Sequence, residues 1–200
     1  MENTKKKGLP VFIGVASVWM GTHFGPGVAS GTQLNQYYVN YGLPGIIMTI
    51  VAMGILGFAL YWAATAAING LLQWLYPGLR NANNDSITTM AGVDYRALLL
   101  YTVALAPVTE ESLFRGLIFS SIHKKHRILA YAVSALAFAA LHIVGYLGTV
   151  PAWQLGLSLL QYLPAGIALA WVYERADSIW ASIVLHMAIN ALSMLALQAM

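Results

Sequence analysis

The sequence predicts an all-α fold, a multi-pass bundle of membrane helices with about six hydrophobic segments. The chain is 59% hydrophobic and only 8% charged, and its mean hydropathy is +0.68. Such a composition lies far outside that of soluble globular proteins. The ten Lys and Arg and the seven Asp and Glu residues form short islands with long uncharged stretches between them. Because a helix needs about 20 apolar residues to cross a bilayer, each stretch can be tested by its length.

The first half of the chain contains two hydrophobic segments. Residues 9–31 are uncharged but rich in Gly and Pro, which predicts a weak or broken helix that is re-entrant or peripheral. The lysines before this segment resemble the start of a signal peptide, but further spans follow and we expect it to be retained. Residues 43–76 carry no charge over 34 positions, enough for one tilted span. The polar residues of 77–94 predict a loop and, within it, a boundary between two domains, 1–79 and 80–200.

The second half contains four more spans. Residues 97–119 form the first of them and are apolar apart from three charges. The 46 uncharged positions of 128–173 are too many for one crossing. Gly and Pro residues near the middle of this stretch divide it into spans 128–147 and 153–173. Residues 178–199 make the last span.

Charge and cysteine content exclude several classes of function. The net charge is +3, but the basic residues flank hydrophobic spans, as topology and headgroup anchors do. We therefore expect the lipid bilayer as a partner and no nucleic acid. Cysteine is absent, which removes disulfides, thiolate metal sites and a Cys nucleophile. The expected location is a bacterial cell membrane, with the chain as an integral membrane protein.

Three charged residues lie inside a predicted span, at Glu110, Glu111 and Arg115. Each costs roughly 2.5–3.5 kcal/mol to insert, so the three require partners or a wet cavity. Glu111 and Arg115 are one helical turn apart and are predicted to form an ion pair. Glu110 points about 100° away from Glu111, which leaves it without this partner. An unpaired carboxylate in a span is a functional candidate.

Two histidines in apolar spans strengthen the prediction of a functional site at Glu110. His142 and His186 lie deep in apolar spans, whereas His123 and His126 lie in a basic loop where a solvated ring needs no further explanation. A single membrane histidine is most simply a hydrogen bond between helices. Two histidines together with Glu110 favour a chemical site. Asn190 follows His186 by one turn and adds an amide to the same helix face.

A base, two imidazoles and an amide suit the attack of water on a peptide bond. A buried carboxylate can accept the proton of water, and imidazole or amide donors can bind the oxyanion. A second mechanism is open, in which a divalent metal such as zinc, held by Glu110, His142 and His186, activates the water. The cofactor is therefore left unassigned. The H-E-x-x-H and G-x-S-x-G signatures are both missing from the sequence.

Three motifs occur in order, each on its own predicted helix. They read Glu110-Glu111-Ser-Leu-Phe-Arg115, Phe138-Ala-Ala-Leu-His142 and His186-Met-Ala-Ile-Asn190. With these motifs, residues 80–200 resemble the CPBP family of intramembrane endopeptidases, which includes type II CAAX prenyl proteases and bacteriocin-processing or immunity proteins. The resemblance implies a four-helix catalytic core that opens into a membrane cavity. It also implies that Glu110 and His142 activate water while His186 and Asn190 bind the oxyanion. The motif residues left in supporting roles are Glu111, Arg115 and Phe138.

The function that follows is an intramembrane endopeptidase acting on a peptide or on a prenylated or membrane-anchored protein. A non-enzymatic membrane scaffold or bacteriocin-immunity factor is the alternative from another class. A transporter-related fragment is a third, because residues 9–40 weakly resemble the broken first helix of amino-acid-transporter-like membrane proteins, which can hold an ion or a carboxylate.

Overall fold

The computed structural model describes residues 32–199, and all elements in this range are helices. Two compact units share the chain, Met1–Met48 and Thr49–Met200, and all contacts described below lie in the second. The predicted segment 9–31 lies outside the described residues, as does most of the transporter-like region. The domain boundary predicted near residue 79 stays a prediction.

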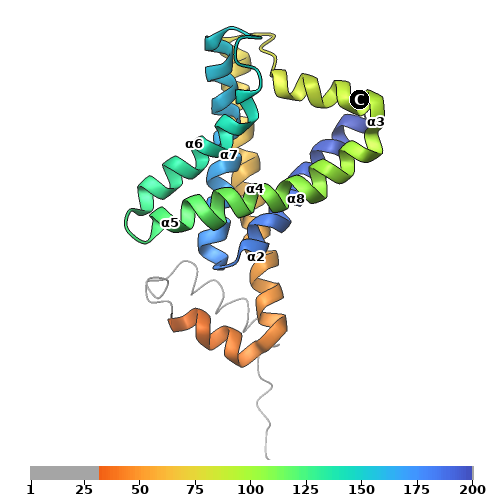
Figure 1. Cartoon of the computed structure of the whole chain (residues 1–200). Helices are drawn as coiled ribbons and strands as arrows, with labels where there is room; N and C mark the ends of the chain where they lie inside the picture. Colours follow the sequence, from red (N-terminus) through yellow and green to blue (C-terminus); the bar gives the residue numbers. More distant parts are fainter. Residues whose placement is uncertain (1–31, 200) are drawn as a thin grey trace, which may run out of the picture. The chain divides into compact units, whose positions relative to one another are not determined.

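Five helical segments in the described range are long and apolar enough to cross a membrane. They are the part Ile47–Leu75 of α2 (Thr32–Leu75), the composite segment Ala82–His123, α6 (Arg127–Val144), α7 (Ala152–Ala176) and α8 (Ile179–Gln198) (Figure 1). These segments confirm the all-α membrane bundle. The spans predicted at 43–76, 128–147, 153–173 and 178–199 match the observed ones to within a few residues at each end.

The polar stretch 77–94 is not a loop throughout, because helix α3 (Ala82–Leu100) begins inside it. Asn81 is the N-cap of α3, and its Oδ1 accepts hydrogen bonds from the backbone N–H groups of Asn83 and Asn84 at 3.0 and 3.3 Å. The loop prediction was wrong for residues 82–93. Asn and Asp favour turns, but they also favour the cap and first turn of a helix, where their side chains satisfy free N–H groups.

A break at Asp94 divides α3 into two pieces. Asp94 has φ −150° and ψ 90°, and its Oδ1 accepts the backbone N–H of Ala97 at 3.0 Å. The side chain therefore caps the second piece as Asn81 caps the first. Because the second piece begins just after Asp94, the third span starts close to its predicted position at residue 97.

The composite segment changes its helical pattern on both sides of Glu110 and Glu111. After α3 come the π-helical η2 (Tyr101–Leu105), α4 (Ala106–Glu111), the π-helical η3 (Ser112–Phe119) and α5 (Ser120–His123). π-Helical turns are rare and often mark functional sites, because they displace side chains and release carbonyl groups from the regular ladder. The two glutamates thus end a short α-helical piece between two irregular ones.

Small residues let the spans approach closely. A Cβ on Gly166 of α7 would lie 2.9 Å from Cα of Ala135 in α6, and one on Gly57 of α2 would lie 2.2 Å from Val172 Cγ2 in α7. Such contacts are typical of helix packing in membranes. Helices α6 and α7 accordingly lie side by side, and α8 packs against α4 (Figure 1). The composite segment, α6, α7 and α8 form the four-helix arrangement that carries the site.

Candidate active site

Glu111 is the centre of the candidate site. Its Oε1 accepts hydrogen bonds from Arg115 Nη1 and from His186 Nδ1, both at 2.9 Å. The side chains of Glu111 and Arg115 are 0% exposed and that of His186 is 5% exposed. The Glu111–Arg115 ion pair predicted from the sequence is therefore present. The bond to His186 was not predicted, and it ties α4 to α8.

Glu110 lies on the other side of the His186 ring. Its Oε2 is 3.9 Å from His186 Nε2, and the side chain is 18% exposed. This oxygen is buried and has no hydrogen-bond partner among the described residues. This distance is too long for a direct hydrogen bond between the two atoms. The two adjacent carboxylates thus contact different nitrogens of one imidazole.

Phe138 joins the two histidines. Its ring centroid lies 4.7 Å from that of His142 and 5.6 Å from that of His186. The guanidinium carbon of Arg115 lies 4.8 Å above the same ring, a favourable cation–π contact. Phe138 is fully buried and packs as predicted, but it packs against three motif residues from three helices.

One edge of the His142 ring is held by its own helix. Its Nδ1 donates to the Phe138 carbonyl, one turn earlier in α6, at 2.9 Å. Because a carbonyl only accepts, Nδ1 carries the hydrogen and Nε2 is the nitrogen left to take a proton. Phe138 contacts both His142 and His186, and His186 Nε2 lies 3.9 Å from Glu110 Oε2. The structure therefore brings both histidines and Glu110 into one polar region inside the bundle.

Arg115 is held by a second helix as well as by Glu111. Its Nη2 donates to the Gly166 carbonyl of α7 at 2.8 Å. The lack of a side chain at Gly166 lets α6 and α7 approach, and its carbonyl lies within reach of the arginine. Arg115 thus links the composite segment to α7. Nothing in the motif spacing pointed to Gly166.

Asn190 is oriented by an irregular backbone. Its Nδ2 donates to the Thr102 carbonyl in η2 at 2.7 Å. That carbonyl is available because the Ala106 N–H, its α-helical partner, bonds to Tyr101 instead. The next residue in the π-helical pattern is Pro107, which has no N–H. One amide hydrogen of Asn190 remains for another acceptor.

Glu110, His142 and His186 do not form a metal site in this structure. The described residues contain no group of three or more His, Cys, Asp or Glu side chains placed to hold a metal ion. The set Glu110, His142 and His186, predicted as ligands if a metal is used, therefore does not fit one in this arrangement.

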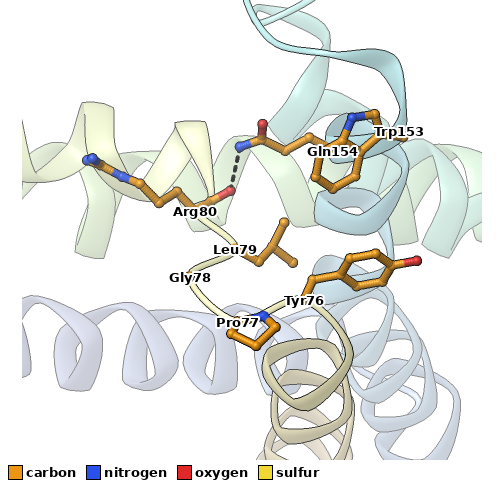
Figure 2. A pocket seen from close by; sticks show the side chains of 7 residues that line it. All are labelled: Tyr76, Pro77, Gly78, Leu79, Arg80, Trp153 and Gln154. Carbon is orange, nitrogen blue, oxygen red and sulfur yellow. Dashed lines mark hydrogen bonds between the residues drawn. The ribbon is translucent and has the colours of Figure 1, made fainter.

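A pocket lies at one end of the bundle, between the α2–α3 loop and the first turn of α7 (Figure 2). Its lining residues are Tyr76, Pro77, Gly78, Leu79, Arg80, Trp153 and Gln154. In Figure 2 the Gln154 side chain donates to the Arg80 carbonyl, at 2.9 Å. None of these residues belongs to the predicted site. The Gln154 bond fixes the loop that leads directly into the Asn81 cap.

Comparisons with known proteins agree with the motifs. The family model "Type II CAAX prenyl endopeptidase Rce1-like" matches residues 92–192, which is 101 of 200 residues and includes all three motifs. The UPF0177 protein YxdF of Lactococcus lactis subsp. lactis (strain IL1403) is 33% identical over 86 residues, 43% of this chain and 42% of that relative. The chain thus matches less than half the length of this relative. No solved structure gives a significant match. This integral membrane protein belongs to the Type II CAAX prenyl endopeptidase Rce1-like family.

Proposed function

We propose that the protein is an intramembrane endopeptidase that hydrolyses a peptide bond with a water activated by Glu110. The observation that carries the proposal is Glu110 Oε2, a buried carboxylate oxygen with no hydrogen-bond partner in the described part of the chain. It faces His186 Nε2 across 3.9 Å. A buried acceptor without a partner is costly, so a site that retains one is prepared for water or a substrate.

These positions support the following reaction. A water beside Glu110 transfers a proton to the carboxylate while its oxygen attacks the peptide carbonyl carbon. The oxyanion that forms accepts hydrogen bonds from His186 Nε2–H, in the doubly protonated ring, and from the remaining amide hydrogen of Asn190. The C–N bond then breaks, and the proton held by Glu110 passes to the leaving nitrogen. His142 assists Glu110 in proton transfer through Nε2, the ring nitrogen that carries no hydrogen.

Glu111 and Arg115 support this chemistry. A carboxylate on Nδ1 fixes the orientation of the His186 ring, so that Nε2 faces Glu110. Arg115 in turn fixes Glu111, through a bond in which both side chains are fully buried. Neither residue needs to touch the substrate. Their arrangement resembles the way a triad carboxylate orients its histidine.

The setting and the family support a proposal for the substrate class. The site lies among helices that are apolar enough to span a membrane, so a hydrophobic or membrane-anchored segment can approach it from the bilayer. The name of the family model refers to CAAX prenyl substrates. We therefore propose a membrane-associated peptide, prenylated or not, as the substrate.

Two matched peptides test the proposal. The full chain, purified in detergent micelles, is incubated with a farnesylated CAAX peptide and with the same peptide without the lipid, and the products are identified by mass spectrometry. We expect one peptide bond to be cleaved, and Glu110→Gln to lower kcat about 10²- to 10⁴-fold with an unchanged unfolding temperature. Glu174→Gln is the control, because Glu174 lies outside the site and should leave kcat unchanged.

Two results would contradict the proposal. The first is Glu110→Gln as active as the natural chain. The second is a folded chain that cleaves neither peptide, which would favour the membrane scaffold or immunity factor instead.

A further inference from the structure

A hydrogen-bonded network of amides and tyrosines lies beside His142 and outside the three motifs. Asn81 Nδ2 donates to Gln161 Oε1 at 2.7 Å, and Gln161 Nε2 donates to Asn69 Oδ1 at 3.1 Å. Tyr146 OH donates to Asn83 Oδ1 at 3.4 Å. The network connects α2, the start of α3, α7 and the loop that follows α6. Side chains that form such a network have few alternative positions.

Tyr162 connects this network to the candidate site. Its hydroxyl accepts from Asn83 Nδ2 at 3.0 Å and donates to Asn81 Oδ1, 3.1 Å away. Its ring stacks on the His142 ring, with centroids 4.5 Å apart and an angle of 26° between the planes. Tyr162 is therefore held at both ends, by α7 at its Cα and by the N-terminus of α3 at its hydroxyl.

The His142 ring needs this second constraint. The bond from Nδ1 to the Phe138 carbonyl fixes one edge of the ring. It leaves the ring able to tilt about that bond. Phe138 contacts the ring at an angle of 46°, so it is the near-parallel Tyr162 ring that sets the tilt. Stacked aromatic rings attract one another beyond the effect of the area that they bury.

We propose that Tyr162 is a positioning residue, which fixes the His142 ring so that Nε2 faces the reaction centre. The inference rests on the proposed function, because it gives His142 a role in proton transfer. Tyr162 itself touches no reacting atom. The polar residues at the start of α3 thereby fix the position of a site residue on α6.

Nuclear magnetic resonance of the full chain tests the positioning without requiring turnover. The protein in detergent micelles carries isotope-labelled histidine, and the His142 signals are assigned by their loss in His142→Gln. In Tyr162→Leu the ring protons of His142 should move downfield, because the shielding by the stacked ring is lost. Tyr162→Phe keeps the ring without its hydroxyl anchor and should give an intermediate shift.

A second tyrosine of α7 supplies the matched control. Tyr173 packs edge-on against Phe119, with centroids 5.7 Å apart, in a cluster that contains no site residue. Tyr173→Leu should leave the His142 signals unchanged. The positioning is overturned if Tyr162→Phe, which keeps the shielding ring, leaves these signals as they are, or if Tyr173→Leu moves them as much as Tyr162→Leu does.

Kinetics then measure the consequence for the reaction. Tyr162→Leu should lower kcat about 10- to 100-fold, as expected for a misplaced catalytic group, with KM within about twofold. Equal kcat in Tyr162→Leu and the natural chain would overturn the role in catalysis. If the natural chain cleaves no peptide, the proposed function fails, and the His142 signals still decide whether Tyr162 positions the ring.

Discussion

The described part of the chain contains two clusters in which a glutamate binds both an arginine and a histidine, and they differ in how fully the carboxylate is hydrogen-bonded. Glu111 binds Arg115 and His186 through the single oxygen Oε1. Its other oxygen, Oε2, is buried and has no hydrogen-bond partner among residues 32–199. The neighbouring Glu110 has an unsatisfied buried oxygen of its own. The cluster around Glu111 is thus incomplete.

The cluster around Glu174 is complete. Its Oε1 accepts from His123 Nε2 at 2.7 Å and from Arg127 Nε at 2.6 Å. Its Oε2 accepts from Arg127 Nη2 at 2.9 Å and from Tyr131 OH at 2.6 Å. These bonds join the end of α7 to the α5–α6 hairpin, and Arg127 remains 59% exposed. The bond between His123 and Glu174 was not predicted, because the sequence indicated a solvated His123 ring in the loop.

The cluster at Glu174 holds helices together, whereas the proposed function gives the cluster at Glu110 and Glu111 a chemical role. A membrane protein can satisfy a carboxylate fully when its purpose is to hold helices together, as at Glu174. At Glu110 and Glu111 two oxygens are left without partners at a cost that packing elsewhere must offset. The difference lies in the number of unused acceptors, because the residue types are the same.

The largest effect on stability is expected from breaking the buried pair at Glu111. Glu111→Leu leaves Arg115 charged, fully buried and without its carboxylate, which should cost about 3–5 kcal/mol of the free energy of unfolding. The double variant Glu111→Leu/Arg115→Met should recover most of this loss, because replacing both partners is often nearly neutral. Its kcat should remain low, since His186 has lost the acceptor on Nδ1. Thermal unfolding in detergent and peptide cleavage measure the two quantities.

A double variant no more stable than Glu111→Leu would contradict this reading. It would mean that Arg115 stabilises the bundle mainly through Gly166 and Phe138, and that the ion pair contributes little.

A smaller effect, on stability alone, is expected at Glu174. Glu174→Gln removes the negative charge. It also replaces one carboxylate oxygen by an NH2 group, which cannot accept the hydrogen bonds that this oxygen accepted. The expected loss is about 1 kcal/mol, because Arg127 is largely solvated and exposed pairs are weak. The loss should shrink at high salt, which screens this pair, and kcat should stay within about twofold. Tyr131→Phe, which removes one donor, should lower the unfolding temperature less. A tenfold loss of kcat in Glu174→Gln would show that the two clusters are coupled.

The sequence predicts the parts of this molecule that depend on length and charge. Uncharged stretches located the observed spans, whereas the functional role of Glu110 stays a prediction. The i, i+4 spacing predicted the Glu111–Arg115 pair. These inferences succeed because they follow from the bilayer thickness and from helix geometry, which do not depend on tertiary contacts.

The parts that failed have two kinds of cause, one local and one that depends on contacts between helices. Residues 82–93 were predicted as loop because a helix cap and a turn use the same side chains. The role of Tyr162 could not be predicted, since a tyrosine in an apolar span usually only packs. The amides at residues 81–84 were the available signal, because so many polar side chains beside a span need partners. The carbonyl that binds Asn190 depends on a π-helical turn that the sequence marks only by Pro107.

The smallest predicted effect concerns that proline. Pro107→Ala supplies an N–H in the turn where the Thr102 carbonyl now has no backbone donor, so the backbone competes with Asn190 for this acceptor. The helix should become slightly more stable, while the Asn190 amide loses its fixed orientation. Peptide cleavage should show kcat lowered about three- to tenfold with KM unchanged, because one of two oxyanion donors is weakened, and outright removal of such a donor costs about 10²–10³.

Pro151→Ala is the matched control for this proline. Pro151 is the N-cap of α7, outside the turn that releases the Thr102 carbonyl, so this variant should leave kcat unchanged. If Pro107→Ala keeps full activity, the Thr102 bond does not orient Asn190 for catalysis. In that case Asn190 is a structural link between helices, like the residues around Glu174. The incomplete cluster then includes His186 of α8 but not Asn190.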